Sequence, residues 1–132
     1  MELSDDKFCF VCGPENPAGL KLRFAVNEDE RSIATAFIPS KYLQGYAGIV
    51  HGGIISAVLD EAMTKLAYSL GYNVVTAKLT VRFKTPLLVG AKVRVKGRLL
   101  EVSGKTIAAE AVATLEDKTV IAESEGILML MK

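Results

Sequence analysis

The residues with the clearest chemical potential lie between positions 50 and 61. His51, the single histidine of the chain, is followed by Gly52 and Gly53. The first N–H groups of a helix have no partners within the helix and lie at the positive end of its dipole. If a helix begins at these glycines, a ligand oxygen can approach its N–H groups closely, so the helix start can polarise a carbonyl and hold an oxyanion. The same two glycines can also form only a tight turn.

Two adjacent carboxylates, Asp60 and Glu61, follow on the same predicted helix, and their neighbours distinguish them. Ser56, Asp60 and Thr64 are spaced by four residues, so they share one face of the predicted helix. This face lies on or beside the apolar face that packs against the rest of the protein. Glu61 has Lys65 four residues later, the order that favours a surface ion pair. We therefore interpret Glu61 as a solvated residue and Asp60 as the candidate catalytic carboxylate. The alternative for Asp60 is an ordinary carboxylate on a helix surface.

The spacing of the two candidate groups limits how they act together. Gly52 and Asp60 are eight positions apart, roughly 12 Å along a helix, so one substrate carbon cannot touch both residues of the same chain. If both serve one reaction, they come from different subunits and the site lies between copies. His51 has two interpretations, as a general base or as a residue that positions the loop before the helix. The Gly-Gly turn directly after it favours positioning.

The pattern of apolar residues predicts the elements that hold these groups. Positions 55, 59, 62, 63, 66 and 70 are apolar, a spacing that predicts a helix over 53–70, and Gly71 stands where that helix should end. Alternating apolar and polar residues predict strands over 20–26, 32–38, 75–84, 92–99, 107–115 and 119–131. One helix cannot cover both faces of a sheet. The predicted fold class is therefore α+β, an antiparallel β-sheet wrapped around one long central helix, in a single domain of residues 1–132.

Composition excludes several classes of function. The chain has 16 Lys and Arg against 15 Asp and Glu, a net charge of +1, which gives no reason to expect nucleic acid as a partner. The N-terminus is acidic and polar, unlike a signal peptide, and no apolar run reaches membrane-spanning length. We therefore expect a cytoplasmic protein without membrane contact.

A basic row lies on the polar faces of the predicted strands. Its members are Lys78, Arg82, Lys84, Lys92, Arg94, Lys96 and Arg98. Two or three of them could bind the phosphates of coenzyme A. A solvated outer face of the sheet is the favoured interpretation.

Cys9 and Cys12 form a Cys-Phe-Val-Cys-Gly motif near the N-terminus. A tetrahedral zinc site needs four ligands, and His51 is far away in the sequence, so we expect no metal site within one chain. A site shared between subunits stays open. A redox dithiol would open a helix after a strand, whereas this motif precedes a Pro-Gly-Asn-rich loop. The favoured interpretation is two reduced thiols that pack an N-terminal turn.

Together these motifs resemble a known family. His51-Gly52-Gly53, with Asp60 nine residues after the histidine on a helix followed by four strands, resembles the hotdog-fold thioesterases of the phenylacetate-pathway and 4-hydroxybenzoyl-CoA type. Residues 9–20 and 43–53 are similar to one branch of that superfamily. The resemblance covers almost the whole chain. Its His-Gly-Gly plus Asp pattern is fairly specific, whereas the Cys-x-x-Cys marks the branch and says little about chemistry.

The resemblance implies an acyl-CoA thioesterase that hydrolyses a thioester to free acid and CoA, with no cofactor. In such enzymes the acid at the position of Asp60 is the nucleophile or the general base for water. The amide at the position of Gly52 polarises the thioester carbonyl from a different subunit. A homodimer, or a homotetramer built as a dimer of dimers, is implied.

Further residues match supporting roles in the family. Thr76, sixteen residues after Asp60, matches a hydroxyl that orients the water or the carboxylate, and Gln44 matches a side-chain amide before the histidine. The candidate site is Asp60, Gly52, Thr76 and His51 for catalysis, with Gly53, Gln44 and Ser56 for substrate binding. The same fold also hosts non-catalytic domains that bind or sense acyl-CoA, which is the main alternative. A scaffold with a decayed site is the weakest reading, because the whole motif is present.

Overall fold

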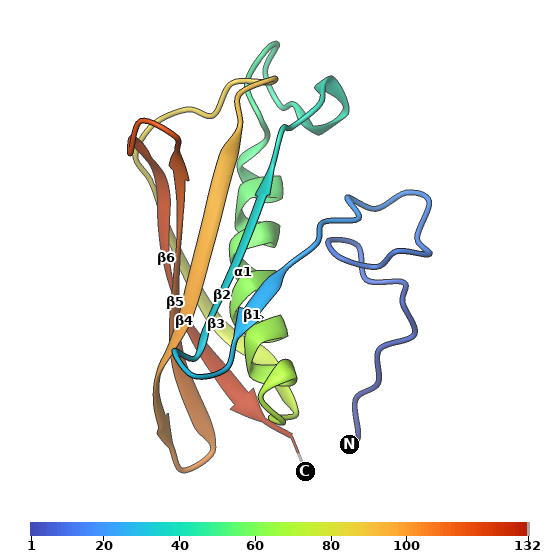
Figure 1. Ribbon diagram of the computed structural model, residues 1–132, viewed down its shortest axis with the longest axis vertical. Helices are drawn as coiled ribbons and strands as arrows, with labels where there is room; N and C mark the ends of the chain where they lie inside the picture. Colours follow the sequence, from blue (N-terminus) through green and yellow to red (C-terminus); the bar gives the residue numbers. More distant parts are fainter. Residues whose placement is uncertain (132) are drawn as a thin grey trace.

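The computed structural model describes residues 1–131, which form one six-stranded antiparallel sheet and one long helix (Figure 1). The elements are β1 (Ala25–Asn27), β2 (Ser32–Phe37), a short 3-10 helix (Lys41–Leu43), α1 (Gly52–Ser69), β3 (Val74–Phe83), β4 (Val93–Ser103), β5 (Thr106–Leu115) and β6 (Val120–Leu130). The strand order is β1-β2-β4-β5-β6-β3, so β1 and β3 are the edges. The sheet packs against α1, which confirms the predicted hotdog architecture.

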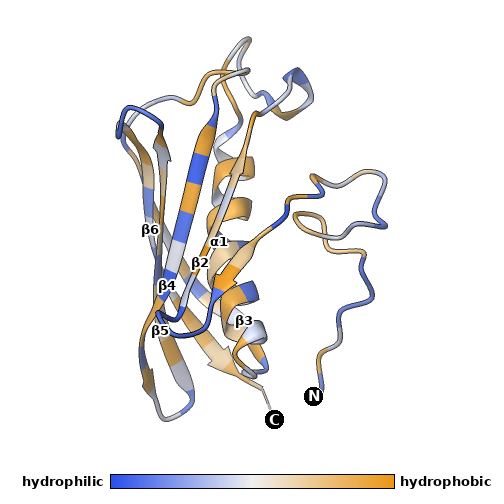
Figure 2. Cartoon of the chain, viewed as in Figure 1, coloured by the Kyte–Doolittle hydropathy of each residue, from blue (hydrophilic) through white to orange (hydrophobic). Residues whose placement is uncertain are grey.

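α1 is buried along one side because its apolar residues recur at helical spacing. The predicted contact positions that are buried are Ile55, Leu59, Ala62, Met63 and Leu66. Figure 2 shows the apolar colour along α1 and the alternation along β4. The helix ends at Ser69, and Gly71 follows with a φ of +94°, as the sequence predicted. Within residues 1–131, no helix combines the length and apolar character needed to cross a bilayer.

The edge strand β3 contains a bulge that decides where Thr76 faces. Thr76 pairs with Leu128 and Lys78 pairs with Ile127, so Ala77 is an extra residue without a partner in the register. The extra residue of a bulge interrupts the alternation of side chains between the two faces of the sheet, so residues before and after it no longer follow one regular pattern. Thr76 therefore lies on the α1 side of the sheet, as its hydrogen bond to Asp60 of α1 shows, and the alternation resumes beyond the bulge.

The first predicted strand, 20–26, is wrong over most of its length, because only its end belongs to β1. Lys21 has a φ of +54°, which breaks an extended strand. The N–H groups of Leu20 and Leu22 donate to carbonyls of the N-terminal segment rather than to a neighbouring strand. Both leucines still pack against the core. The alternation of apolar and polar residues here reflects the packing of these leucine side chains and does not indicate pairing with another strand. The other predicted strands are present with small shifts at their ends.

Residues 1–24 form an irregular segment that lies against the side of α1 away from the sheet (Figure 1, dark blue). The Cys-x-x-Cys turn is part of it, and both cysteine side chains contact α1. The helix is therefore covered on two sides, by the sheet and by this segment.

Candidate active site

Asp60 lies in the middle of α1 and faces the bulged strand β3. The Thr76 hydroxyl donates a hydrogen bond of 2.5 Å to Asp60 Oδ1. Both side chains are half-buried. The structure thus brings together two residues that are sixteen positions apart in the sequence, and it leaves Asp60 Oδ2 without a recorded protein donor among residues 1–131.

The surroundings of Asp60 shift its protonation. Burial raises the pKa of the Asp60 carboxyl, because the charged form loses solvation. The hydrogen bond from Thr76 opposes that shift by stabilising the carboxylate, and the neighbouring charge of Glu61 adds to it. A carboxylate with a raised pKa is a stronger base than one in water, which suits it to accept a proton from water.

The start of α1 is organised by His51. His51 is the N-cap of the helix, and its Nδ1 accepts a 2.8 Å hydrogen bond from the Gly53 N–H. The His51 carbonyl accepts from the N–H groups of Ile54 and Ile55. This capping contact confirms the positioning role that the Gly-Gly sequence indicated. The assignment of His51 to the catalytic group stays a prediction.

Gly52 is the first residue of α1, and its N–H differs from those that follow. Within residues 1–131 the Gly52 N–H has no acceptor, whereas the next three N–H groups all donate to His51. A Cβ at Gly52 would lie 3.3 Å from Cζ of Phe83, the last residue of β3. The Gly52 N–H is therefore free to donate to a ligand. The space beside Phe83 accommodates glycine at this position but little more than glycine. The sequence pattern does not predict that the Phe83 ring lies beside Gly52.

The remaining predicted residues lie at the same end of α1. Gln44 Oε1 accepts a 3.0 Å hydrogen bond from the Gly48 N–H, which braces the loop that leads into His51. The Ser56 hydroxyl donates back to the Gly52 carbonyl at 3.0 Å. Gln44 and Ser56 thus hold the helix start, and within residues 1–131 neither side chain forms a hydrogen bond with the Asp60 carboxylate.

The predicted site residues form two groups in one protomer. Asp60 and Thr76 form the first, in the middle of α1, and the residues around Gly52 form the second, at its start. β3 runs along α1 in the opposite direction, so Phe83 lies by Gly52 whereas Thr76 lies by Asp60. The fold keeps the two groups apart, as the helical spacing of roughly 12 Å requires.

Glu61 was expected to be solvated and paired with Lys65, and the structure contradicts this. The Glu61 side chain is half-buried, and its Oε2 accepts from the Cys12 thiol at 2.6 Å and the Cys9 thiol at 3.3 Å. Lys65 Nζ donates to Cys12 Sγ at 3.5 Å, and no ion pair within residues 1–131 joins it to Glu61. Sequence reasoning missed this cluster because its members are about fifty positions apart.

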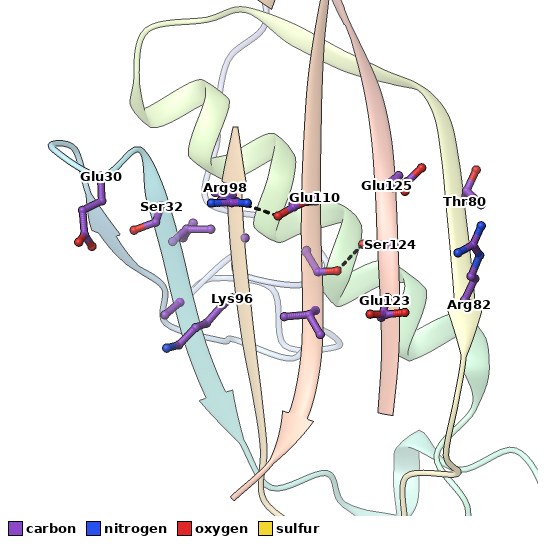
Figure 3. A pocket seen from close by; sticks show the side chains of 15 residues that line it. Glu30, Ser32, Thr80, Arg82, Lys96, Arg98, Glu110, Glu123, Ser124 and Glu125 are labelled. Carbon is purple, nitrogen blue, oxygen red and sulfur yellow. Dashed lines mark hydrogen bonds and ion pairs between the residues drawn. The ribbon is translucent and has the colours of Figure 1, made fainter. Parts of the chain in front are cut away.

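A separate groove of about 770 Å³ lies on the sheet face away from α1 (Figure 3). Side chains of both charges project into it, and Arg98 donates to Glu110 at 2.7 Å across two strands. Four members of the predicted basic row have carboxylate partners: Lys84 with Glu123, Lys92 and Arg94 with Glu116, and Arg98 with Glu110. These ion pairs compensate the charges across neighbouring strands, which agrees with the favoured interpretation of this face as a solvated one. That interpretation stays a prediction, and Asp60 is the better candidate for catalysis.

Comparison of the sequence with known families gives one match that spans this site. The model of the family described as the thioesterase superfamily matches residues 47–122, which include the start of α1, Asp60 and Thr76. Among curated relatives, the mouse acyl-coenzyme A thioesterase THEM5 is 30% identical over 104 residues, 78% of this chain and 42% of the relative. The chain spans half or less of the length of the mouse and cattle relatives.

Solved structures share the fold. A thioesterase superfamily protein, RHA08564, superposes with a TM-score of 0.87 at 25% identity, over 93% of this chain and 63% of that one. The protein smu.793 from Streptococcus mutans, solved with acetyl CoA bound, superposes with a TM-score of 0.77 at 16% identity, over 83% of this chain and 88% of that one.

Proposed function

Because the chain belongs to the thioesterase superfamily, we propose that it hydrolyses an acyl-CoA thioester to a free acid and CoA, with Asp60 as the catalytic carboxylate. The hydrogen bond between Thr76 and Asp60 Oδ1 is the single observation that carries this proposal. It holds one carboxylate oxygen in place on a half-buried helix face and leaves the other oxygen for a reactant. The acetyl CoA bound to smu.793 and the names of the curated relatives support acyl-CoA as the substrate class.

A pair of mutant structures adds support. A hypothetical thioesterase from Streptococcus pneumoniae, 14% and 13% identical to this chain in its two structures, was solved with an aspartate and with a threonine replaced by alanine. Those two positions are sixteen residues apart, the same separation as Asp60 and Thr76.

The proposed reaction uses two groups on opposite sides of the thioester carbonyl. A water oxygen attacks the carbonyl carbon while Asp60 Oδ2 takes a water proton, and the oxyanion that forms accepts a hydrogen bond from the Gly52 N–H. The tetrahedral intermediate then collapses, the C–S bond breaks, and the CoA sulfur leaves with the proton that Asp60 held. In the alternative, an Asp60 oxygen attacks the carbonyl carbon directly, the C–S bond breaks and the CoA thiolate leaves and takes a proton from solvent. Water then hydrolyses the resulting mixed anhydride, which frees the acid and regenerates the Asp60 carboxylate.

We further propose that the Gly52 of one subunit acts with the Asp60 of another. The separation of the two groups within a protomer supports this arrangement, because one carbonyl carbon cannot reach both. β3 supports it as well: this strand contacts both groups and lies at the edge of the sheet, where its free N–H and C=O groups can pair with a second copy. A homodimer with two equivalent sites satisfies these constraints, and so does a dimer of dimers.

Release of free CoA thiol, followed with a thiol-reactive dye, tests the activity. The panel includes short, medium, long and aromatic acyl-CoAs, with Asp60→Asn alongside and Asp29→Asn, a solvent-exposed carboxylate in the β1–β2 turn, as the matched control. We expect release on some panel members, lost in Asp60→Asn and retained in Asp29→Asn. Acyl-CoA binding without release by the unmodified chain would instead favour the non-catalytic acyl-CoA-binding domain.

A further inference from the structure

Cys9, Cys12 and Glu61 form a cluster on the side of α1 away from the sheet, outside the proposed active site. Their two Sγ atoms and one carboxylate oxygen all lie within 4.8 Å of one another. In tetrahedral zinc sites with Zn–S bonds of about 2.3 Å, neighbouring sulfur ligands are about 3.8 Å apart. The three donor atoms are therefore already close to the spacing that one small cation requires. Counting only cysteine and histidine ligands in the sequence overlooked the carboxylate.

The Cys-x-x-Cys turn is built to place both sulfurs on one side. The Gly13 N–H donates to the Cys9 carbonyl at 2.9 Å, and the Val11 N–H donates to Cys9 Sγ at 3.4 Å. A Cβ at Gly13 would lie 2.3 Å from the Cys9 backbone nitrogen, so no other residue fits there without moving the turn. A backbone N–H that points at a cysteine sulfur stabilises a thiolate, because it donates to the charged form.

The charges around the cluster fit a divalent cation. Two thiolates and the Glu61 carboxylate carry three negative charges, and Lys65, whose Nζ lies 3.5 Å from Cys12 Sγ, supplies one positive charge. A divalent cation supplies the other two.

We propose that Cys9 Sγ, Cys12 Sγ and the Glu61 carboxylate bind one Zn²⁺ per chain. Soft thiolates with one carboxylate suit zinc better than magnesium or calcium, which prefer oxygen ligands alone. A cavity of about 350 Å³, lined by the cluster together with Asp6, adjoins it and leaves space for a water or an added ligand in the fourth position. Binding deprotonates the two thiols and releases their protons to solvent, with no change in oxidation state.

The metal would join the N-terminal segment to the middle of α1. Glu61 directly follows Asp60, so a metal bound there would fix the turn of helix that carries the catalytic carboxylate. The role assigned to the metal is structural, and it does not depend on the proposed hydrolysis.

Metal binding by the reduced, chelator-treated chain tests this site without an activity assay. We expect Zn²⁺ to bind at one equivalent per chain by calorimetry and to raise Tm by mass action. Co²⁺ should give a thiolate-to-cobalt charge-transfer band and tetrahedral d–d bands. Cys12→Ser should weaken Zn²⁺ binding at least about 100-fold, and Glu61→Gln at least about tenfold, since loss of a ligand costs no less than loss of an outer-shell partner. Glu15→Gln, an exposed carboxylate in the same segment, is the matched control and should bind as the unmodified chain does.

Three binding results would overturn the proposal: absence of Zn²⁺ binding by the reduced chain, equal affinity in Glu61→Gln and the unmodified chain, or Co²⁺ binding without a charge-transfer band. Free thiols that appear only after reductant is added would show that Cys9 and Cys12 form a disulfide, and this would overturn it too. If Cys12→Ser fails to fold, Glu61→Gln and the Co²⁺ spectrum of the unmodified chain still decide the question.

Discussion

Asp60 and Glu61 are consecutive residues of α1, yet they face different parts of the molecule. Asp60 accepts a hydrogen bond from Thr76 of β3, and Glu61 accepts from the thiols of Cys9 and Cys12 in the N-terminal segment. Consecutive helical residues point about 100° apart, so a helix covered on two sides can present one carboxylate to each cover. In the two proposals the partner decides the chemistry of each carboxylate: the Thr76 hydroxyl would orient a base, and the two thiols would complete a set of metal ligands with Glu61.

The largest expected effect separates the two carboxylates directly. Asp60→Asn should lower kcat/KM for a responsive acyl-CoA about 10³-fold, within the range typical of general-base catalysis, because the amide cannot accept the water proton. Glu61→Gln should lower it far less, since Glu61 does not touch the reacting atoms. Steady-state thiol release on both variants measures the ratio. Equal losses would mean that the two carboxylates do not have separate roles.

The next largest effect concerns the start of α1. Gly52→Pro deletes the proposed oxyanion donor at the first helical position, where proline is well tolerated, and should lower kcat about 10²-fold. Gly52→Ala is the control, because it keeps the N–H while its Cβ approaches the Phe83 ring to 3.3 Å. Thiol-release kinetics on both variants test the role of the N–H. Similar losses in the two would attribute the effect to crowding against Phe83.

A smaller effect sharpens the role of Thr76. Thr76→Val removes the hydroxyl and keeps the side-chain shape, so kcat should fall about tenfold. The hydrogen bond from Thr76 lowers the pKa of Asp60, so its loss raises that pKa. Because the proposed mechanism uses Asp60 in its carboxylate form, the acidic limb of the pH–rate profile should move to higher pH. A profile that stays in place, with kcat reduced, would assign Thr76 to packing alone.

The smallest effect is on stability. The pKa of Asp60 is higher in the fold than its ordinary value of 3.8, so the folded chain binds this proton more tightly than the unfolded chain. Its contribution is therefore favourable at pH values below 3.8, and it is lost as the pH rises through the folded-state pKa. At neutral pH the buried charge opposes folding, and Asp60→Asn should raise Tm. Thermal unfolding at pH 7 measures this, and a lower Tm in the variant would contradict the cause assigned to the shift.

The sequence predicted the elements that depend on local periodicity and missed the features set by distant contacts. α1 and its buried residues followed from the spacing of apolar positions, and Gly71 marked its end. Residues 20–24 alternate like a strand, but the N–H groups of Leu20 and Leu22 donate to the N-terminal segment, which the local pattern does not show. The bulge after Thr76 is likewise a matter of pairing with β6.

The candidate site divides in the same way. The contact between Asp60 and Thr76 agrees with the resemblance, and the His51 cap with the Gly-Gly sequence. The partner of Glu61 could not be predicted, because the expected i to i+4 pair with Lys65 competes with thiols that reach α1 from the N-terminal segment. The position of the Phe83 ring near Gly52 could not be predicted either, because it depends on how β3 runs along α1.

The central claim is that Gly52 of one subunit and Asp60 of another form one site, and subunit complementation tests it most directly. Asp60→Asn and Gly52→Pro, each with strongly reduced activity alone, are mixed in equal amounts, dissociated and reassembled, and thiol release is measured. Each mixed dimer then holds one intact site, so random reassembly should restore roughly a quarter of the unmodified activity. If mixed dimers form and release stays at the level of the separate variants, the two residues do not act across the interface, and the account is contradicted.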